Sequence, residues 1–360
     1  MSARRSLAVE LTSACNQTCG HCYNAWREDG GREIGALSTE GLVAALERIL
    51  ANVELDHVTF TGGEPFSRRD LFELLEVCRA HGVRFQMISN AGLITDELAS
   101  RLAGYEPISI QVAVNAPDAA LHDDLAGGAG HFERTLRGLE ALRRAGVRVV
   151  GCVVVTRKNA QCVGETLDLL ASRGVREISF SRFSPAGFAT RQLAELLPSR
   201  SEIVGALEAA EGRAIRHGLT LRSTMPIPPC VIDYDDYPHV SFGQCAIGSE
   251  VQELVLGPRG EIRHCTLHAS TLGEVAAVDD HALDALLRSP GYRDVTPEFC
   301  TPCPHVAVCL GGCGAAAIAV SGARGLDPFV AQHVDPELST RLARERASRG
   351  LVPSSALIRR

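Results

Sequence analysis

Three cysteines lie within eight residues near the start of the chain, at positions 15, 19 and 22. A tight loop with this C-x3-C-x2-C spacing can aim three thiolates at one centre, but it supplies no fourth thiolate. Structural zinc sites use four protein ligands, whereas an iron–sulfur cluster held by three cysteines keeps one iron open to another ligand. The spacing of Cys15, Cys19 and Cys22 therefore favours an iron–sulfur cluster. A metal-free loop or part of a zinc site is the alternative.

A second group of residues suited to chemistry is Thr61-Gly-Gly-Glu-Pro65, which follows an apolar run at 57–60. Consecutive glycines let the backbone approach a ligand closely, and a carboxylate at a strand end can pair with an ammonium group. By itself, Gly-Gly-Glu-Pro is more often simply a turn. Its place after a second predicted strand, about 40 residues beyond the cysteine loop, favours a binding site.

Together these motifs resemble those of the radical SAM superfamily. The resemblance implies that Cys15, Cys19 and Cys22 hold a 4Fe-4S cluster whose open iron chelates S-adenosylmethionine through its amino and carboxylate groups. It further implies that an electron from the cluster cleaves this cofactor to methionine and a 5′-deoxyadenosyl radical. In the family, the amino group is held by the motif that corresponds here to Gly62, Gly63 and Glu64.

The same resemblance assigns further cofactor contacts. His21 takes the place of an aromatic residue that packs on the adenine, although an ordinary surface histidine is the alternative. Ser89 and Asn90 follow the third predicted strand and Asn115 follows the fourth, at positions that meet the methionyl and ribose portions. Relatives often have Ser-x-Asp where this chain has Ala113-Val-Asn115, so the ribose contact is the least complete match. A stretch at 122–130 also matches the family, with a helix cap and loop as an equal alternative.

Apolar runs rich in β-branched residues alternate with helical patterns along the first 220 residues. The runs predict six strands, at 7–11, 57–60, 83–88, 108–114, 147–155 and 177–181. Apolar residues recurring at three and four positions predict six helices, at 39–50, 70–81, 96–103, 132–145, 162–173 and 202–217. Six β/α units imply a parallel sheet with helices outside it, two units short of a closed barrel. We therefore expect an α/β fold, a partial (β/α)6 TIM-like barrel, with its active site at the carboxyl ends of the strands.

A second set of cysteines lies near the C-terminus, at spacings that suit zinc or iron–sulfur clusters. Joined to the barrel, the set resembles the SPASM extension, a small cysteine-rich domain that holds up to two auxiliary 4Fe-4S clusters. The resemblance assigns a nearer cluster to Cys245, Cys265 and Cys313. It assigns a farther cluster to Cys300, Cys303 and Cys309.

The farther cluster lacks one ligand of the family pattern. That pattern ends with a cysteine shortly after an Asp-Pro pair, and this chain has Val330 in its place. Asp327 could substitute, the site could be left to water or substrate, or the cluster could be absent. We favour an open or oxygen-ligated site. Some relatives give the nearer cluster an upstream cysteine, a role for which Cys230 or His239 is available.

Two cysteines outside these groups have competing interpretations. Cys152 lies inside a predicted strand, where it would pack as a small hydrophobic residue, and Cys162 begins a predicted helix. A thiol that faces the substrate could instead donate a hydrogen atom, as radical epimerases require.

Length and composition bound the organisation of the chain. Its 360 residues are 45% hydrophobic, carry a net charge of −7 and include 13 cysteines. We expect a barrel at 1–220, a SPASM domain at 221–335 that begins with a proline-rich linker at 221–238, and a C-terminal helix (336–349) and tail to 360. One hairpin is predicted from 251–256 and 261–267. The composition predicts no membrane span, no signal peptide and no nucleic-acid partner. We expect reduced cysteines in the cytoplasm.

Taken together, the resemblance implies a radical SAM enzyme that abstracts hydrogen from a substrate. Our first hypothesis is modification of a ribosomally made peptide by oxidation or cross-linking. The second is a small molecule of secondary metabolism, such as a sugar, nucleoside or tetrapyrrole, and the third a non-catalytic iron–sulfur or zinc protein. A flavodoxin or ferredoxin would supply electrons. Only about six residues precede the first strand, so we expect a separate protein to bind any leader peptide.

Overall fold

The parallel strands of the predicted barrel form in a computed structural model that describes residues 6–24, 27, 35–249, 251–277, 285–286, 291 and 295–351. All six predicted strands are present. They are β1 (Ser6–Glu10), β2 (His57–Thr61), β3 (Phe85–Ser89), β4 (Ile110–Ala113), β5 (Val149–Val155) and β6 (Glu177–Arg182). Each pairs in parallel with the next along the chain, which confirms the α/β fold.

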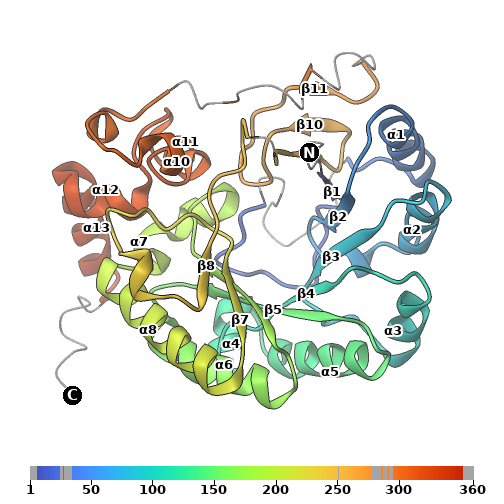
Figure 1. The fold of residues 1–360 in the computed structure, drawn as a ribbon, viewed down its shortest axis with the longest axis horizontal. Coiled ribbons are helices and arrows are strands. Elements are labelled where there is room, and N and C mark those ends of the chain that lie inside the picture. The colour runs from blue at the N-terminus through green and yellow to red at the C-terminus, as the bar shows by residue number, and fades with distance from the viewer. Residues whose placement is uncertain are drawn as a thin grey trace.

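Helices cover the outer face of this sheet (Figure 1). The six predicted helices correspond to α1 (Thr39–Asn52), α2 (Leu71–Ala80), α3 (Asp96–Ala103), α5 (His131–Arg144), α6 (Val163–Ser172) and α8 (Arg200–His217). Their starts follow the expected capping chemistry: the Ser38 side chain accepts from Gly41 N, and Ser199 and Glu202 form a capping box. Two short helices, α4 (Ala119–Ala126) and α7 (Leu193–Leu196), were not predicted.

The strands alternate between an apolar and a polar face, as a period of two residues requires. In β2, Val58 and Phe60 are fully buried in the core under the helices, and Phe60 packs edge-on against Phe85. On the other face, Gln86 Nε2 donates to Thr59 Oγ1 at 3.0 Å. The concave side of the sheet therefore carries polar groups that can meet a ligand.

The predicted linker at 221–238 is wrong at its first residues, because the sheet continues there. Strand β7 (Thr220–Ser223) pairs in parallel with β6, and β8 (Val240–Phe242) pairs in parallel with β7. β7 begins at the predicted domain boundary. Both strands are short. β7 alternates exposed and buried residues over only four positions, which is too short a pattern to stand out beside the proline-rich segment that follows.

The cysteine-rich region also extends the sheet. The predicted hairpin forms as β9 (Glu253–Leu256) and β10 (Glu261–Arg263), followed by β11 (Gly273–Glu274). Unexpectedly, β9 pairs in parallel with β1, with Leu7 opposite Leu254. In the part of the chain that is described, the sheet has the order β11-β10-β9-β1-β2-β3-β4-β5-β6-β7-β8.

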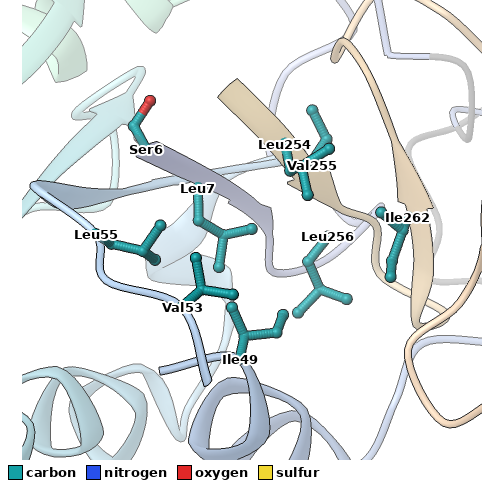
Figure 2. A pocket seen from close by; sticks show the side chains of 9 residues that line it. All are labelled: Ser6, Leu7, Ile49, Val53, Leu55, Leu254, Val255, Leu256 and Ile262. Carbon is teal, nitrogen blue, oxygen red and sulfur yellow. The ribbon is translucent and has the colours of Figure 1, made fainter. Parts of the chain in front are cut away.

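The junction between β1 and β9 is apolar. Figure 2 shows Leu7 of β1, Ile49 of α1, and Leu254 and Leu256 of β9 around a small cavity at this junction. A buried ion pair between Glu10 and Arg263 joins β1 to β10. The hairpin is therefore attached to the barrel by backbone pairing, apolar packing and charge.

The chain ends in helices α10 (Val306–Cys309), α11 (Gly314–Ser321), α12 (Pro328–Val334) and α13 (Pro336–Ser348). In Figure 1 they lie beside α7 and α8. α13 confirms the predicted C-terminal helix, whereas the end of the predicted tail, 352–360, lies outside the described residues. Within the described ranges, we find no helix with the length and apolar character needed to span a membrane.

Candidate active site

The loop that carries Cys15, Cys19 and Cys22 follows β1 at the carboxyl edge of the parallel strands. Burial raises the pKa of the Cys19 thiol, and the nearby Cys22 and Cys15 raise it further. Burial likewise raises the pKa of Cys15 to about 11. Three thiols that interact electrostatically in a desolvated loop would be stabilised as thiolates by a bound metal. Across the described ranges, no three His, Cys, Asp or Glu side chains are grouped to hold a single metal ion.

Backbone contacts with the end of β2 fix one side of this loop. Gly63 N donates to Thr12 O at 2.7 Å, and Glu64 N donates to Ala14 O at 2.9 Å. A Cβ atom on Gly63 would lie only 2.0 Å from Ala14 O. Gly62 has a φ of +123°, a conformation that favours glycine. The two glycines are therefore required by the loop itself, besides any contact with a cofactor.

The other side of the loop rests on the end of α4. Thr18 N donates to Ala126 O at 3.0 Å, and the Thr18 hydroxyl donates to Gly127 O at 2.9 Å. Asp123 accepts hydrogen bonds from the backbone of Gly130 and Phe132, which supports the cap interpretation of the stretch at 122–130. This stretch thus supports the cysteine loop through the backbone carbonyls of Ala126 and Gly127.

The Glu64 carboxylate is fully buried and connects the ends of β2 and β3. It accepts from Ser89 Oγ at 2.7 Å, from Asn90 N at 2.8 Å and from Phe66 N at 3.2 Å. Burial raises its pKa to about 7, although these hydrogen bonds oppose the shift. Asn90 Nδ2 in turn donates to Asn16 Oδ1 at 2.7 Å. Three predicted cofactor residues thus form one connected group beside the cysteine loop.

His21 and Asn115, both predicted to contact the cofactor, lie together. Asn115 Nδ2 is 3.5 Å from His21 Nε2, and Asn115 Oδ1 accepts from Val154 N at 2.8 Å. Burial lowers the pKa of His21 to about 4, so the ring is neutral near pH 7. Its buried Nδ1 has no hydrogen-bond partner among the described residues. A neutral ring with an unpaired polar atom suits contact with an adenine base.

Sequence reasoning missed Arg27. Its Nη1 donates to Cys19 O at 2.6 Å, and its guanidinium lies 4.0 Å from the centre of the Phe188 ring. Its positive charge opposes the rise in pKa of Cys15 and Cys19. No local motif marks an arginine that is positioned by a distant phenylalanine, so the pattern alone gave no signal.

The C-terminal cysteines gather in two groups. Burial raises the pKa of Cys265 to about 12, and the charges of Cys313 and Cys245 contribute to this rise. Burial also raises the pKa values of Cys300 and Cys309, and the charge of the nearby Cys303 contributes to both shifts. Cys300, Cys303 and Cys309 also line one cavity. The assignment of each set to a cluster stays a prediction.

The suggested extra ligands are engaged elsewhere. His239 is exposed, and its ring is paired with the Glu211 carboxylate. Cys230 interacts with Cys309, Cys300 and Cys303, which belong to the farther set. Asp327 is fully buried in an ion pair with Arg182, so its carboxylate is already occupied. In this structure His239 and Asp327 are thus held in ion pairs, and Cys230 lines a cavity with the farther set.

Arg182 and Asp327 join the barrel to the nearer cysteine set. Arg182 Nη2 lies 2.6 Å from Asp327 Oδ2, and the same oxygen accepts from Cys313 N at 2.8 Å. The Ser184 hydroxyl, just beyond β6, donates to Cys313 Sγ at 3.4 Å. Both charged side chains have an exposed fraction of 0%. One cysteine of the nearer set is thus positioned by the end of a barrel strand.

The structure combines a partial parallel barrel with a three-cysteine loop at the carboxyl edge of its strands. These two features are typical of one class of iron–sulfur enzymes. Residues 9–170 match the family model for the radical SAM superfamily. These residues, which include the cysteine loop and the segment Gly62–Glu64, thus form a radical SAM domain. Members of the superfamily use S-adenosylmethionine with a 4Fe-4S cluster, and the cysteine loop described above has the donor set for that cluster.

Relatives match nearly the whole chain. It is 29% identical over 354 residues to mycofactocin maturase MftC of Mycobacterium tuberculosis, covering 94% of this chain and 85% of that protein. It is 26% identical over 340 residues to the PqqA peptide cyclase of Methylocella silvestris, covering 92% and 88%. Among solved structures, native anSMEcpe with bound AdoMet and Cp18Cys peptide has the same fold, with a TM-score of 0.67 at 17% identity, covering 95% and 99%.

Replacement of Gly63 by alanine should release the cysteine loop. The added Cβ would collide with Ala14 O, and only a backbone shift could relieve the contact. We expect anaerobically reconstituted Gly63→Ala to lose about four irons per chain, one 4Fe-4S cluster, in iron and sulfide assays. Gly205→Ala is the control, because nothing lies within 4 Å of the place that its Cβ would take on α8. Full iron content in Gly63→Ala would contradict the proposed tight contact.

Glu64→Gln should retain the cluster but weaken binding of S-adenosylmethionine. An amide would turn a donor toward Ser89 Oγ or Asn90 N, and the negative charge near the cofactor's ammonium would be lost. The loss of a hydrogen bond to a charged group, about 1.5–3 kcal/mol, corresponds to about ten- to a hundredfold in affinity.

Calorimetry as a function of pH provides the check. A bound cation favours the ionised form of Glu64, so wild-type affinity should rise as the pH increases through about 7. This rise should be smaller in Glu64→Gln. Glu253→Gln is the control, since Glu253 is a half-buried carboxyl with a raised pKa that accepts from Ser6 and Thr59, away from the cysteine loop. Equal affinities for wild type and Glu64→Gln would exclude this role for Glu64.

Asp327→Asn should destabilise the protein, because it leaves the buried Arg182 charge without its partner. Breaking a buried pair in this way costs about 3–5 kcal/mol. Anaerobic urea unfolding measures the loss, with Asp96→Asn as control. The Asp96–Arg144 pair is exposed, so its loss should cost at most about 1 kcal/mol. Equal effects of the two substitutions would mean that the buried pair has no special importance.

Proposed function

We propose that this radical SAM enzyme modifies a ribosomally made peptide. The observation that carries the proposal is similarity over nearly the full chain to a mycofactocin maturase and a PqqA peptide cyclase. The fold match to an enzyme solved with a bound peptide supports it. The net change we propose is an oxidation or a cross-link within the peptide.

In this proposal, Cys15, Cys19 and Cys22 hold the radical SAM cluster. When bound, the cluster and S-adenosylmethionine supply an electron and a carbon-centred radical that can abstract hydrogen from a C–H bond. The chain's own residues fix the geometry. Gly63 holds the loop through Thr12, and Glu64 orients Ser89 and Asn90. His21 and Asn115 receive the adenosine portion.

We place the substrate on the polar, concave side of the sheet, next to the cysteine loop. Tyr23 follows Cys22, is half-buried, and has its hydroxyl hydrogen-bonded to Thr61. Cys152 on β5 is buried with its thiol bonded to Ser179, and burial raises its pKa to about 11. Neutral hydroxyl and thiol groups of this kind can hydrogen-bond to a peptide backbone without the desolvation cost of a charge. The Cys152 thiol remains a candidate hydrogen-atom donor.

We further propose that residues 221–335 act as a SPASM domain with one or two auxiliary 4Fe-4S clusters. The two groups of cysteines described above support this assignment. Such clusters would accept an electron from the substrate or help to bind it. A flavodoxin or ferredoxin is the proposed electron donor, and a separate protein the proposed carrier of any leader peptide.

Anaerobic turnover tests the proposal. The reconstituted protein would be reduced with dithionite in the presence of S-adenosylmethionine and short peptides encoded beside its gene. We expect formation of 5′-deoxyadenosine and a loss of hydrogen mass from the peptide. The variant with Cys15, Cys19 and Cys22 replaced by alanine should form neither product. Cofactor cleavage coupled only to a small molecule, with no change in any peptide, would instead support the second hypothesis.

A further inference from the structure

The cavity beside the farther cysteine set contains a fourth cysteine that the family pattern does not predict there. Cys300, Cys303, Cys309 and Cys230 all line it, and so does Val330, which stands where the family has its last cysteine. The other lining residues are glycine, proline or apolar side chains. Four thiols and no carboxylate or imidazole thus surround this cavity among the described residues. We propose that Cys230 is the fourth ligand of the farther iron–sulfur cluster and replaces the cysteine missing at position 330.

The segment that carries Cys230 is anchored, so it can present a thiol in a fixed position. Val231 N donates to Pro228 O at 2.9 Å and closes a turn around Cys230. The buried Val231 is held in place because Arg200 Nε donates to its carbonyl at 2.7 Å. The Tyr234 hydroxyl donates to Ile227 O at 2.6 Å on the other side. Proline at 228 and 229 further restricts the backbone.

The cavity fits a group bound by thiolates. Gly311 has a φ of +74°, and a Cβ atom there would lie 3.3 Å from Cys300 Sγ and 2.8 Å from Pro297 Cγ. The backbone of Gly311 and Gly312 hydrogen-bonds to the Cys309 sulfur. Hydrogen bonds to the sulfurs are among the features that set the reduction potential of an iron–sulfur cluster.

The competing ligand is already engaged elsewhere. Asp327 is absent from the residues that line the cavity, and its carboxylate bonds to Arg182, Cys313 N and Phe329 N. Movement into the cavity would break a buried ion pair, whereas Cys230 requires no such rearrangement. A cluster with four thiolates has no open iron, so the proposal assigns electron transfer rather than substrate binding to the farther cluster.

Metal content and spectroscopy of the full chain test the ligand. The proposal rests on the proposed function for the presence of auxiliary clusters, but it is tested without turnover. Reconstituted wild type should hold about twelve irons and twelve sulfides per chain, four of each per cluster. Cys230→Ala should lose up to a third of the iron or show the EPR signal of a 3Fe cluster. Cys162→Ser is the matched control, a half-buried cysteine outside the three sets.

A rescue variant guards against simple misfolding. Val330 lines the same cavity, so Cys230→Ala combined with Val330→Cys should restore the iron content and the wild-type EPR spectrum. Unchanged iron and EPR in Cys230→Ala would overturn the proposal. Zinc in place of iron at these cysteines, or only about eight irons in wild type, would also overturn it. None of these outcomes bears on cleavage of S-adenosylmethionine or on peptide modification, which test the proposed function.

Alkylation of the unmodified protein provides a second measurement. The Cys230 residue is exposed in the structure, so a free thiol there should react readily with iodoacetamide. If Cys230 binds the cluster, it should be protected in the loaded protein and react after iron is removed by a chelator, as mapped by mass spectrometry. Rapid labelling of Cys230 in protein with full iron content would contradict the assignment.

Discussion

The buried ion pair between Arg182 and Asp327 determines how the C-terminal region stands against the barrel. Arg182 lies at the end of β6, and it also donates to the carbonyls of Pro226 and Phe183. Its guanidinium lies 4.6 Å from the centre of the Phe329 ring on α12. Asp327 caps α12 and holds the backbone of Cys313. Because each charge is desolvated, neither residue can leave this arrangement without a large cost.

The cysteine loop at the other end of the site depends mainly on backbone contacts. Gly63 and Glu64 hold its start and Ala126 its middle, while Ala189 N donates to Cys22 O at 2.9 Å at its end. The positive charge of Arg27 lies near the loop and opposes the rise in the pKa of Cys19. The backbone of the loop is therefore fixed by elements that converge from β2, α4 and the segment after β6.

The sequence predicted those features that depend on local patterns. The six β/α units were evident because each strand and helix has its own periodicity, and the cysteine spacings identified both the radical SAM loop and the C-terminal sets. Features that depend on distant residues were not predictable. No pattern in β9 indicates that it pairs with β1. Nothing near Arg27, Arg182 or Arg263 marks them as buried charges. The ion pair that Asp327 forms was not predictable, because its partner lies 145 residues away.

The pairing of β9 with β1 also has a consequence for how the chain is made. Strand β1 gains its second neighbour only when residues 253–256 are available, since Ser6 and Glu253 are 247 positions apart. Until then, the strand that leads into the cysteine loop is an open sheet edge, which invites association with other chains. Because the chain is synthesised from its N-terminus, the barrel would stay incomplete during most of its synthesis. The nascent enzyme would need protection until its cysteine-rich hairpin emerges, and a barrel cut away from that hairpin would keep the exposed edge permanently.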